Sequence, residues 1–197
     1  MNAHTNHKRV LKMVQISLFA ALVAVLQVIS TIVPMPYVRI TLTLIPVVLG
    51  GVYFGKGAAI FLGAVFGVVV TAFTVSGVDV GANMMFLARP FLTVFICFAK
   101  GMLAGLVSAF VYELLHKNQK FDDVKAITIA AAVAPIVNTA FFCIFLFAFY
   151  PEILQQWAGG TNVIIYMITG LVGINFVVEL LLNVILCPVI GTKVKMK

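Results

Sequence analysis

The sequence is poor in charged residues. Only 10% of its 197 residues are Asp, Glu, Lys or Arg, whereas an ordinary globular domain carries about 25%. At the same time 63% of the residues are hydrophobic, and the mean hydropathy is +1.17. A water-soluble domain of this size keeps a large exposed surface and cannot hide so many apolar side chains. The composition therefore argues against a soluble fold, a disordered chain and a nucleic-acid-binding domain.

Side chains that build catalytic or metal sites are also scarce. The three cysteines, Cys97, Cys143 and Cys187, lie in apolar runs and form no CxxC pair, so they are interpreted as buried and reduced. The three histidines lie in polar stretches and suggest no metal ligand or catalytic base. There is no Walker A, HExxH, GxSxG or dinucleotide-binding motif. We therefore expect no enzymatic activity, no catalytic residues, no metal and no cofactor in this chain.

What the sequence does contain is a series of long apolar runs. A membrane-spanning helix needs about 20 such residues. The runs predict an all-α integral membrane protein with six transmembrane helices in a single domain over residues 1–197. The expected spans are residues 10–33, 41–54, 58–75, 88–115, 126–150 and 162–190. The second run is short and contains Pro46, so half of a re-entrant pair with the third run is the alternative.

The basic residues predict the orientation of these helices. Ten of the 13 Lys and Arg residues fall in the N-terminal tail, the turn at residues 55–57, the loop at residues 116–125 and the C-terminal tail. The opposite loops hold Arg39 and Arg89, and Lys100 lies inside a span. Cytoplasmic segments carry an excess of Lys and Arg. Both termini are therefore predicted to be cytoplasmic. The net charge of +7 is interpreted mainly as the result of this topology, and it also attracts anionic lipid.

Polar residues within the spans are costly and so are candidates for function. Lys100, Asn138 and Asn175 each lie 12 or 13 residues from the outer end of their span, about 18–20 Å deep. Three helices thus place a polar side chain at one level, which indicates the floor of a pocket open to the outside. Glu179 follows Asn175 on the same helix face. It either supports Lys100 beneath a ligand or forms an ion pair that only fixes helix packing, and the sequence weighs these alternatives equally.

The segments that connect the spans on the outer side, residues 34–40, 76–87 and 151–160, are predicted to be loops with bulky or polar side chains. They are either interfacial anchors or lids over the pocket, and for any single residue anchoring is favoured two to one. The candidate ligand contacts from these loops and from the outer mouth of the fourth span are Tyr37, Arg39, Asn83, Trp157 and Arg89.

Small residues four apart form a second pattern, which allows close approach of helix backbones. The first span contains Ala20 and Ala24, and Ser17 and Ala21 repeat the spacing. On this helix the pattern predicts a flat strip that docks another membrane protein. Glycine pairs with the same spacing occur at residues 51/55, 63/67 and 101/105.

Nearly the whole chain resembles the substrate-binding S component of an energy-coupling factor (ECF) transporter, a bacterial vitamin-uptake system. The resemblance rests on the size, the six spans, the alanines at positions 20 and 24, and two runs in a fixed order. Residues 45–57 read IPVVLGGVYFGKG and residues 63–67 read GAVFG. The resemblance implies a protein of the bacterial cell membrane whose first three helices contact a transmembrane coupling (T) subunit through Ala20 and Ala24. The outer loops and helices four to six would bind the vitamin, and two cytoplasmic ATP-binding subunits would use ATP.

The identity of the ligand is less constrained. Lys100 and Arg89, with the amides of Asn83, Asn138 and Asn175, favour an anionic ligand that carries hydroxyl and amide groups. Pantothenate fits this description and resembles the ligand of one branch of the family. Folate, riboflavin, pyridoxine or a thiamine precursor are alternatives, as is a stand-alone small secondary carrier. A membrane enzyme and a structural scaffold are further alternatives. For an enzyme, Lys100 and Glu179 are the only candidate acid–base pair in the sequence, and a scaffold needs no ligand.

Overall fold

The computed structural model describes residues 2–32, 42–117 and 121–193, and every regular element in these ranges is a helix. A helix satisfies its own backbone hydrogen bonds, which is the requirement that a hydrocarbon environment imposes. The predicted all-α fold class is confirmed for these ranges. The elements are α1 (Asn2–Ile32), α2 (Leu44–Phe54), α3 (Lys56–Val75), α4 (Val80–Ala88), α5 (Pro90–Lys117), α6 (Asp123–Phe149), α7 (Pro151–Ala158), α8 (Val163–Tyr166), the π-helical segment η1 (Met167–Val172) and α9 (Gly173–Lys193).

Five helical runs in the described ranges are long and apolar enough to cross a membrane. They are His7–Thr31, Lys56–Val75, Pro90–Lys117, Asp123–Phe149 and Val163–Lys193, the last of which combines α8, η1 and α9. The second predicted span is instead the 11-residue helix α2. At 1.5 Å per residue α2 is about 16 Å long, roughly half of the 30 Å hydrocarbon layer. The prediction of six full crossings is therefore supported for five helices only.

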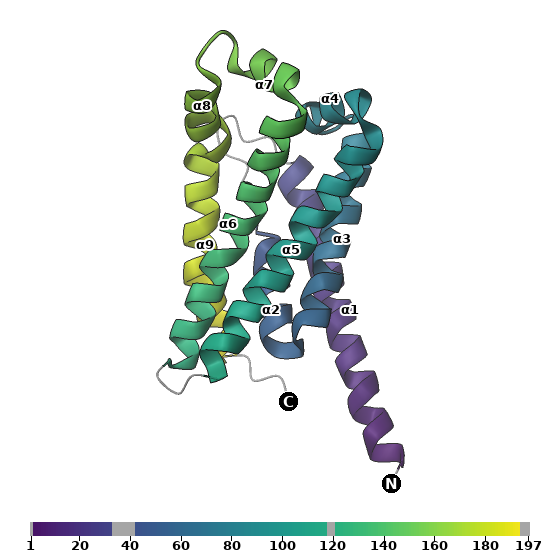
Figure 1. Cartoon of the computed structure of the whole chain (residues 1–197). Coiled ribbons are helices and arrows are strands. Elements are labelled where there is room, and N and C mark those ends of the chain that lie inside the picture. Colours follow the sequence, from purple (N-terminus) through teal and green to yellow (C-terminus); the bar gives the residue numbers. More distant parts are fainter. Residues whose placement is uncertain (1, 33–41, 118–120, 194–197) are drawn as a thin grey trace.

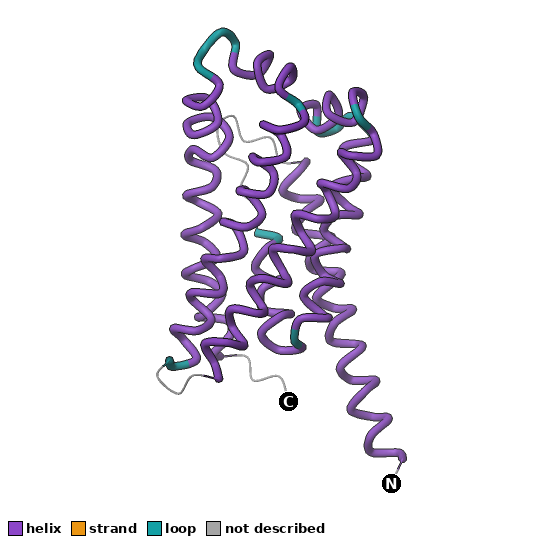
Figure 2. Tube along the Cα trace, viewed as in Figure 1, coloured by secondary structure: helices purple, strands orange, loops and turns teal. Residues whose placement is uncertain are grey.

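The helices form a bundle with two distinct ends. Figure 1 shows the start of α1, the turn between α2 and α3 and the end of α9 at the lower end, whereas α4, α7 and α8 lie at the upper end. Two contacts fix the lower end: Lys12 Nζ donates to the Phe54 carbonyl (3.2 Å) and Tyr53 Oη donates to the Ile190 carbonyl (3.3 Å). The described connections lie at these two ends, apart from the short piece before α2 (Figure 2). The assignment of the lower end to the cytoplasm stays a prediction.

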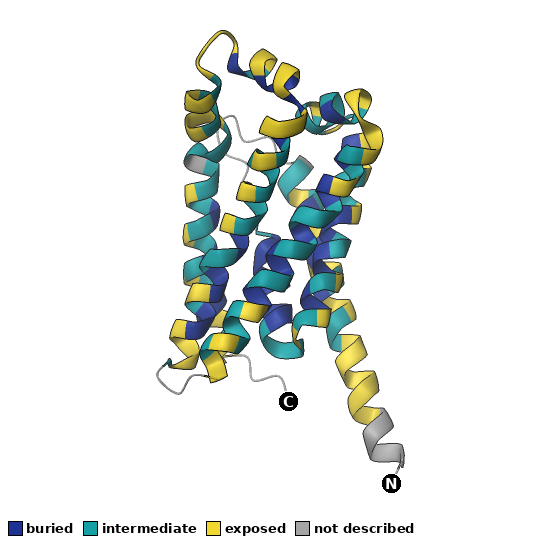
Figure 3. Cartoon of the chain, in the orientation of Figure 1, coloured by how far each residue is buried: buried dark blue, intermediate teal, exposed yellow. Residues whose placement is uncertain are grey.

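Helix α2 is the centre of the lower core. Its residues 44–51 are buried in succession, and Phe19 and Val23 of α1, Leu62 of α3 and Ile127 of α6 belong to the same hydrophobic cluster. Figure 3 shows this buried region in dark blue and the lower part of α1 as exposed. A short apolar helix surrounded by protein needs no lipid contact, which explains why α2 is apolar on all sides without spanning the bilayer.

Helices α3 and α5 approach each other through glycine. A Cβ atom added at Gly63 would collide with the Gly101 carbonyl, and one added at Gly67 would lie 2.8 Å from Phe98 Cα. A Cβ at Gly105 would lie 2.5 Å from the Ala59 carbonyl oxygen. The glycine pairs 63/67 and 101/105 therefore bring these two helix backbones together, as small residues do in membrane proteins, whereas a Cβ added at Gly55 of the pair 51/55 would meet no atom within 4 Å.

The two described outer segments correct the prediction of loops. Residues 80–88 form α4 and residues 151–158 form α7. Asp79 caps α4, because its Oδ1 accepts a hydrogen bond from the Ala82 amide (3.2 Å). Pro151 occupies the first turn of α7, where its missing N–H is not needed. Met85 of α4 and Leu154 of α7 are buried and belong to an upper hydrophobic cluster that also contains Leu146 of α6.

Candidate substrate site

A cavity of about 510 Å³ lies in the upper half of the bundle, between α3, α5 and α6 and under α4 and α7. Its size falls in the range of small-molecule sites, about 300–1,000 Å³. The residues that line it are Val70, Asp79, Gly81, Ala82, Met85, Thr93, Ile96, Cys97, Lys100, Asn138, Thr139, Phe142, Trp157, Tyr166 and Leu171. Three of the nine predicted ligand contacts, Lys100, Asn138 and Trp157, are therefore brought together, and whether they bind a ligand stays a prediction.

Lys100 provides positive charge in this cavity. Its Nζ lies 5.6 Å from the ring centroid of Phe66 and 5.3 Å from that of Phe142. Within the described ranges, these ring contacts are the interactions that the structure gives for the ammonium group, and no carboxylate lies within salt-bridge distance of it. The two rings stabilise the cation through their negative faces without using its hydrogen-bond donors. The ammonium group can therefore donate to an anion in the cavity.

Asn138 contributes an acceptor to the same cavity. Its Oδ1 is buried and has no hydrogen-bond partner among the described residues. Such an atom loses the free energy of one hydrogen bond unless a ligand or water donates to it. Lys100 and Asn138 thus offer a cationic donor and a neutral acceptor from α5 and α6, which is the combination that an anion with hydroxyl or N–H groups requires.

The outer part of the cavity is more aromatic than the sequence indicated. Trp157 of α7 packs against α4 at Gly81, where an added Cβ would lie 3.3 Å from the indole ring. Phe142 and Tyr166 also line the cavity, and so does the carboxylate-bearing residue Asp79. Among the described residues, the cavity lining therefore combines one lysine, one aspartate and three aromatic side chains.

A buried hydroxyl contact joins the start of α5 to the residue that follows α6. Thr93 Oγ1 donates to the Arg89 carbonyl (2.9 Å) and lies 2.8 Å from Tyr150 Oη. Tyr150 is 3% exposed, and burial raises its pKa above the usual value for tyrosine. The exposed Arg89 guanidinium lies 6.0 Å from the Tyr150 ring centroid. Arg89 is thus at the outer end of α5, as predicted, but it is not among the cavity-lining residues.

The other predicted contacts lie elsewhere. Asn83 Nδ2 donates to the Thr74 carbonyl (2.9 Å) and so holds the turn between α3 and α4. Asn175 and Glu179 of α9 are not among the cavity-lining residues either, and Glu179 is 8% exposed. Tyr37 and Arg39 lie outside the described residues.

The position of Asn175 has a physical cause. Its predicted depth and direction assumed an unbroken α-helix from residue 162, but Met167–Val172 form a π-helical segment with wider turns. Gly173, with φ 4° and ψ −142°, then departs from helical geometry at the junction between η1 and α9. These changes alter the face that α9 presents, so Tyr166 and Leu171 from this run line the cavity and Asn175 does not.

Helical spacing would have revealed several missed residues. Thr93, Ile96 and Cys97 precede Lys100 by seven, four and three residues, which places them on one face of α5. Phe142 follows Asn138 by four residues on α6. Asp79 belongs to the segment that was predicted as a loop, and its proximity to the cavity follows from the position of α4.

The predicted docking residues lie on α1. Ala20 and Ala24 are half-buried beside the buried positions Phe19 and Val23, and Ala20 packs against the lower core. Ala21 on the same helix is exposed. The structure contains no partner chain, so the docking role of these alanines stays a prediction.

Comparison with known proteins gives one family. The family model described as "ECF transporter, substrate-specific component" matches residues 11–191. A comparison with curated protein sequences gave no match. The matched region includes every described residue that lines the cavity.

Proposed function

This chain belongs to the family of ECF transporter substrate-specific components, and from this premise we propose that it captures an anionic water-soluble vitamin, with pantothenate as the best candidate. The observation that carries the proposal is the ammonium group of Lys100, which lies in the cavity between two aromatic rings and has no carboxylate partner among the described residues. In this function the chain binds and orients its substrate and catalyses no reaction.

The positions of three polar side chains predict how the ligand lies in the site. A carboxylate at the level of Lys100 gains a charge-assisted hydrogen bond in a partly water-free environment. A hydroxyl or amide N–H of the same ligand satisfies Asn138 Oδ1, which is otherwise without a donor. Arg89, exposed at the outer end of α5, attracts the anion toward the mouth. Pantothenate carries a carboxylate, an amide and hydroxyl groups, so its chemistry matches these groups.

The aromatic lining favours two further candidates, which are vitamins that contain a ring system. Phe142, Trp157 and Tyr166 offer planar apolar surfaces that a ring-containing vitamin contacts well. Folate combines a ring system with carboxylates, and riboflavin is a ring system without a carboxylate. Folate has carboxylates that Lys100 can bind and riboflavin has none, so the effect of a Lys100 substitution on binding distinguishes the two candidates.

Transport requires partners in this proposal. The family implies a transmembrane coupling subunit and ATP-binding subunits, and we assign the contact with the coupling subunit to Ala20 and Ala24 of α1. ATP is used by the two cytoplasmic partner subunits, and the complex lies in the bacterial cell membrane with both termini of this chain cytoplasmic. Residues of α1 to α3 form the coupling side, and the later helices form the substrate side.

A panel of vitamins tests the proposal on the purified protein in detergent. A ligand present at 100 times its Kd stabilises the folded state by about 2.7 kcal/mol, which corresponds to a rise in Tm of roughly 5–10 °C for a chain of this length. We expect pantothenate to give this shift and the other vitamins to give less. If no vitamin raises Tm or shows heat of binding in calorimetry, the capture function is wrong.

Flux measurements test the dependence on partners. Proteoliposomes that contain this chain alone should accumulate no labelled vitamin, whereas co-reconstitution with the coupling and ATP-binding subunits should give ATP-dependent uptake. Uptake by the chain alone would favour the stand-alone carrier instead.

A further inference from the structure

A second cavity, which is apolar, lies on the surface of the α3–α5 pair. Its volume is about 390 Å³, and all of its lining residues are apolar; they come from α3 and α5 and include Ile60, Phe95, Phe98, Met102 and Leu106. Phe95 is 54% exposed, so the groove opens toward the surroundings of the bundle. On a helix pair that spans a membrane, these surroundings are lipid chains.

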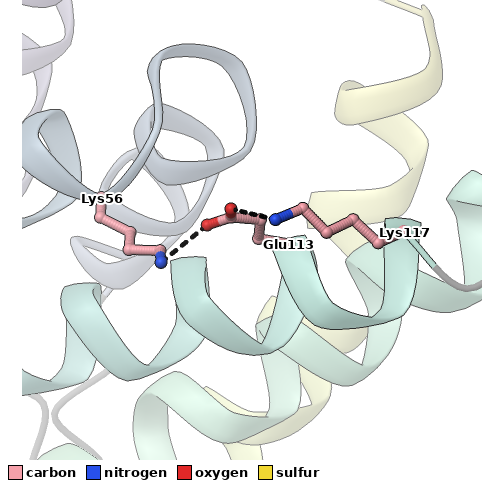
Figure 4. Close-up of polar contacts among 3 residues, drawn as sticks. All are labelled: Lys56, Glu113 and Lys117. Atoms are coloured by element: carbon pink, nitrogen blue, oxygen red, sulfur yellow. Dashed lines mark hydrogen bonds and ion pairs between the residues drawn. The ribbon is translucent and has the colours of Figure 1, made fainter.

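A basic cluster lies at the lower end of the same helix pair. Lys56 Nζ lies 2.8 Å from Glu113 Oε2, and Lys117 Nζ lies 2.9 Å from Glu113 Oε1 (Figure 4). Two ammonium groups therefore share one carboxylate, and the cluster keeps one net positive charge. The side chains of Lys56 and Lys117 are 39% and 72% exposed, so an outside anion can reach both.

The start of α3 adds to this positive charge. Lys56 and Gly57 occupy the first turn of a 20-residue helix, whose N-terminal end carries a partial positive charge. The amides of Ala58 and Ala59 already donate to the Gly55 carbonyl (3.1 and 3.2 Å), so the amides that an outside anion can reach are those of Lys56 and Gly57. A Cβ atom added at Gly55 or Gly57 would meet no atom within 4 Å, so the space beside this turn is open. An anionic group held by the lysines can therefore also approach backbone N–H groups.

One face of α5 connects the groove with the basic cluster. Met102, Leu106, Phe110, Glu113 and Lys117 follow each other at intervals of three or four residues, which is the spacing of a single helix face. The centroid of the Phe110 ring lies 4.9 Å from Lys56 Nζ. Along α5, Phe110 lies between the groove residues and the basic cluster. Leu106 is seven residues from Glu113, about 10 Å along the helix axis. An acyl chain that spans half of a 30 Å hydrocarbon layer reaches it.

We propose that this surface binds one anionic phospholipid, with the phosphate at Lys56, Lys117 and the start of α3 and one acyl chain along Phe110 into the groove. The charge of the cluster selects an anionic headgroup over a zwitterionic one. The apolar groove accommodates a chain of ordinary length, and a short chain does not reach it. The proposal does not depend on which vitamin the other cavity binds.

Native mass spectrometry of the protein released from mixed nanodiscs tests the proposal. The nanodiscs contain equal amounts of dioleoyl phosphatidylglycerol and dioleoyl phosphatidylcholine. We expect the parent protein to retain phosphatidylglycerol preferentially. Each lysine near a membrane surface contributes about fivefold to binding of anionic lipid, so Lys56→Gln and Lys117→Gln together should lower retention by roughly 25-fold.

The matched control is Lys125→Gln. Lys125 is also an exposed lysine paired with an acid, Asp122 at 3.6 Å, but it lies on α6. We expect this variant to retain lipid as the parent does. Equal retention of the two lipids by the parent protein, or equal loss in the control and the double variant, overturns the proposal.

A groove variant tests the position of the acyl chain. Ala99 lines the groove and is half-buried, so Ala99→Leu fills the groove without entering the core. We expect it to weaken retention of the dioleoyl lipid severalfold and to leave binding of dihexanoyl phosphatidylglycerol unchanged. If retention of both lipids is unchanged, the acyl chain does not occupy the groove and the proposal is wrong as stated. The Tm of each variant in detergent shows whether it is folded.

Discussion

Replacement of Lys100 by methionine distinguishes ligand binding from helix packing. Methionine keeps an unbranched side chain of similar length and removes the charge. In the protein without ligand, a lysine within a spanning helix costs about 2.5–3.5 kcal/mol, and a cation–π contact returns about 0.5–2 kcal/mol. With Phe66 and Phe142 both in range, these opposing contributions are of similar size. We therefore expect the Lys100→Met variant to unfold at a Tm equal to or above that of the parent.

Ligand binding should change in the opposite direction. If the Lys100 ammonium group donates to the ligand's carboxylate, the variant loses one charge-assisted hydrogen bond of about 1.5–3 kcal/mol. Because 1.4 kcal/mol corresponds to a tenfold change, Kd should rise by about 10- to 150-fold. A residue that only stabilises packing would lower Tm and would leave Kd nearly unchanged.

Isothermal titration calorimetry and thermal unfolding of the same detergent-purified samples measure both quantities. Lys125→Met is the control, because Lys125 is exposed and lies far along α6 from Asn138. A parental Kd in the Lys100→Met variant would refute the reasoning about the ligand. A Tm several degrees below the parental value without ligand would instead show that Lys100 holds α5 in place through the aromatic rings.

Four further variants test other parts of the structure. Asn138→Ala should raise Kd by about 2- to 13-fold in calorimetry, because a neutral hydrogen bond contributes about 0.5–1.5 kcal/mol. Gly63→Ala should lower Tm markedly by forcing α3 from α5, at a cost of about 1–3 kcal/mol, whereas Gly57→Ala, which meets no atom, should not. Thr43→Val should lower Tm, because Thr43 Oγ1 donates to a buried glutamine on α1 (2.9 Å). Ala24→Leu should preserve vitamin binding and abolish uptake by the reconstituted complex; normal uptake would exclude a docking role.

Much of the fold follows from hydrophobic patterning. The long apolar runs predicted α1, α3, α5, α6 and the α8–α9 run, because only a helix of about 20 residues satisfies its backbone across a membrane. The glycine pairs predicted close helix contacts, although their partners came from the structure. The short helices α4 and α7 were missed for different reasons. The nine residues of α4 are mostly apolar and show little helical periodicity. The eight residues of α7 do have an apolar face, with Ile153, Leu154 and Ala158 buried, and this helical spacing was a signal that the loop prediction did not use.

The site was less predictable because depth along a helix does not specify direction. Lys100 and Asn138 lie in unbroken stretches of α-helix, and both line one cavity, whereas their binding of a ligand stays a prediction. Asn175 lies beyond a π-helical segment, where the α-helical count no longer applies. Asn83 has a nearby backbone acceptor at Thr74, and a single sequence does not show that a turn uses its amide.

The glycine contacts between α3 and α5 hold together two walls of the cavity. Because these backbones touch at Gly63 and Gly101, a side chain added at either position forces the two helices apart. Gly77, Gly159 and Gly160, beside α4 and α7, adopt φ values of 79°, 56° and 87°, which residues with a side chain rarely adopt. If a ligand reaches Lys100 past these two short helices, a disulfide that joined α4 to α7 should slow both its entry and its release.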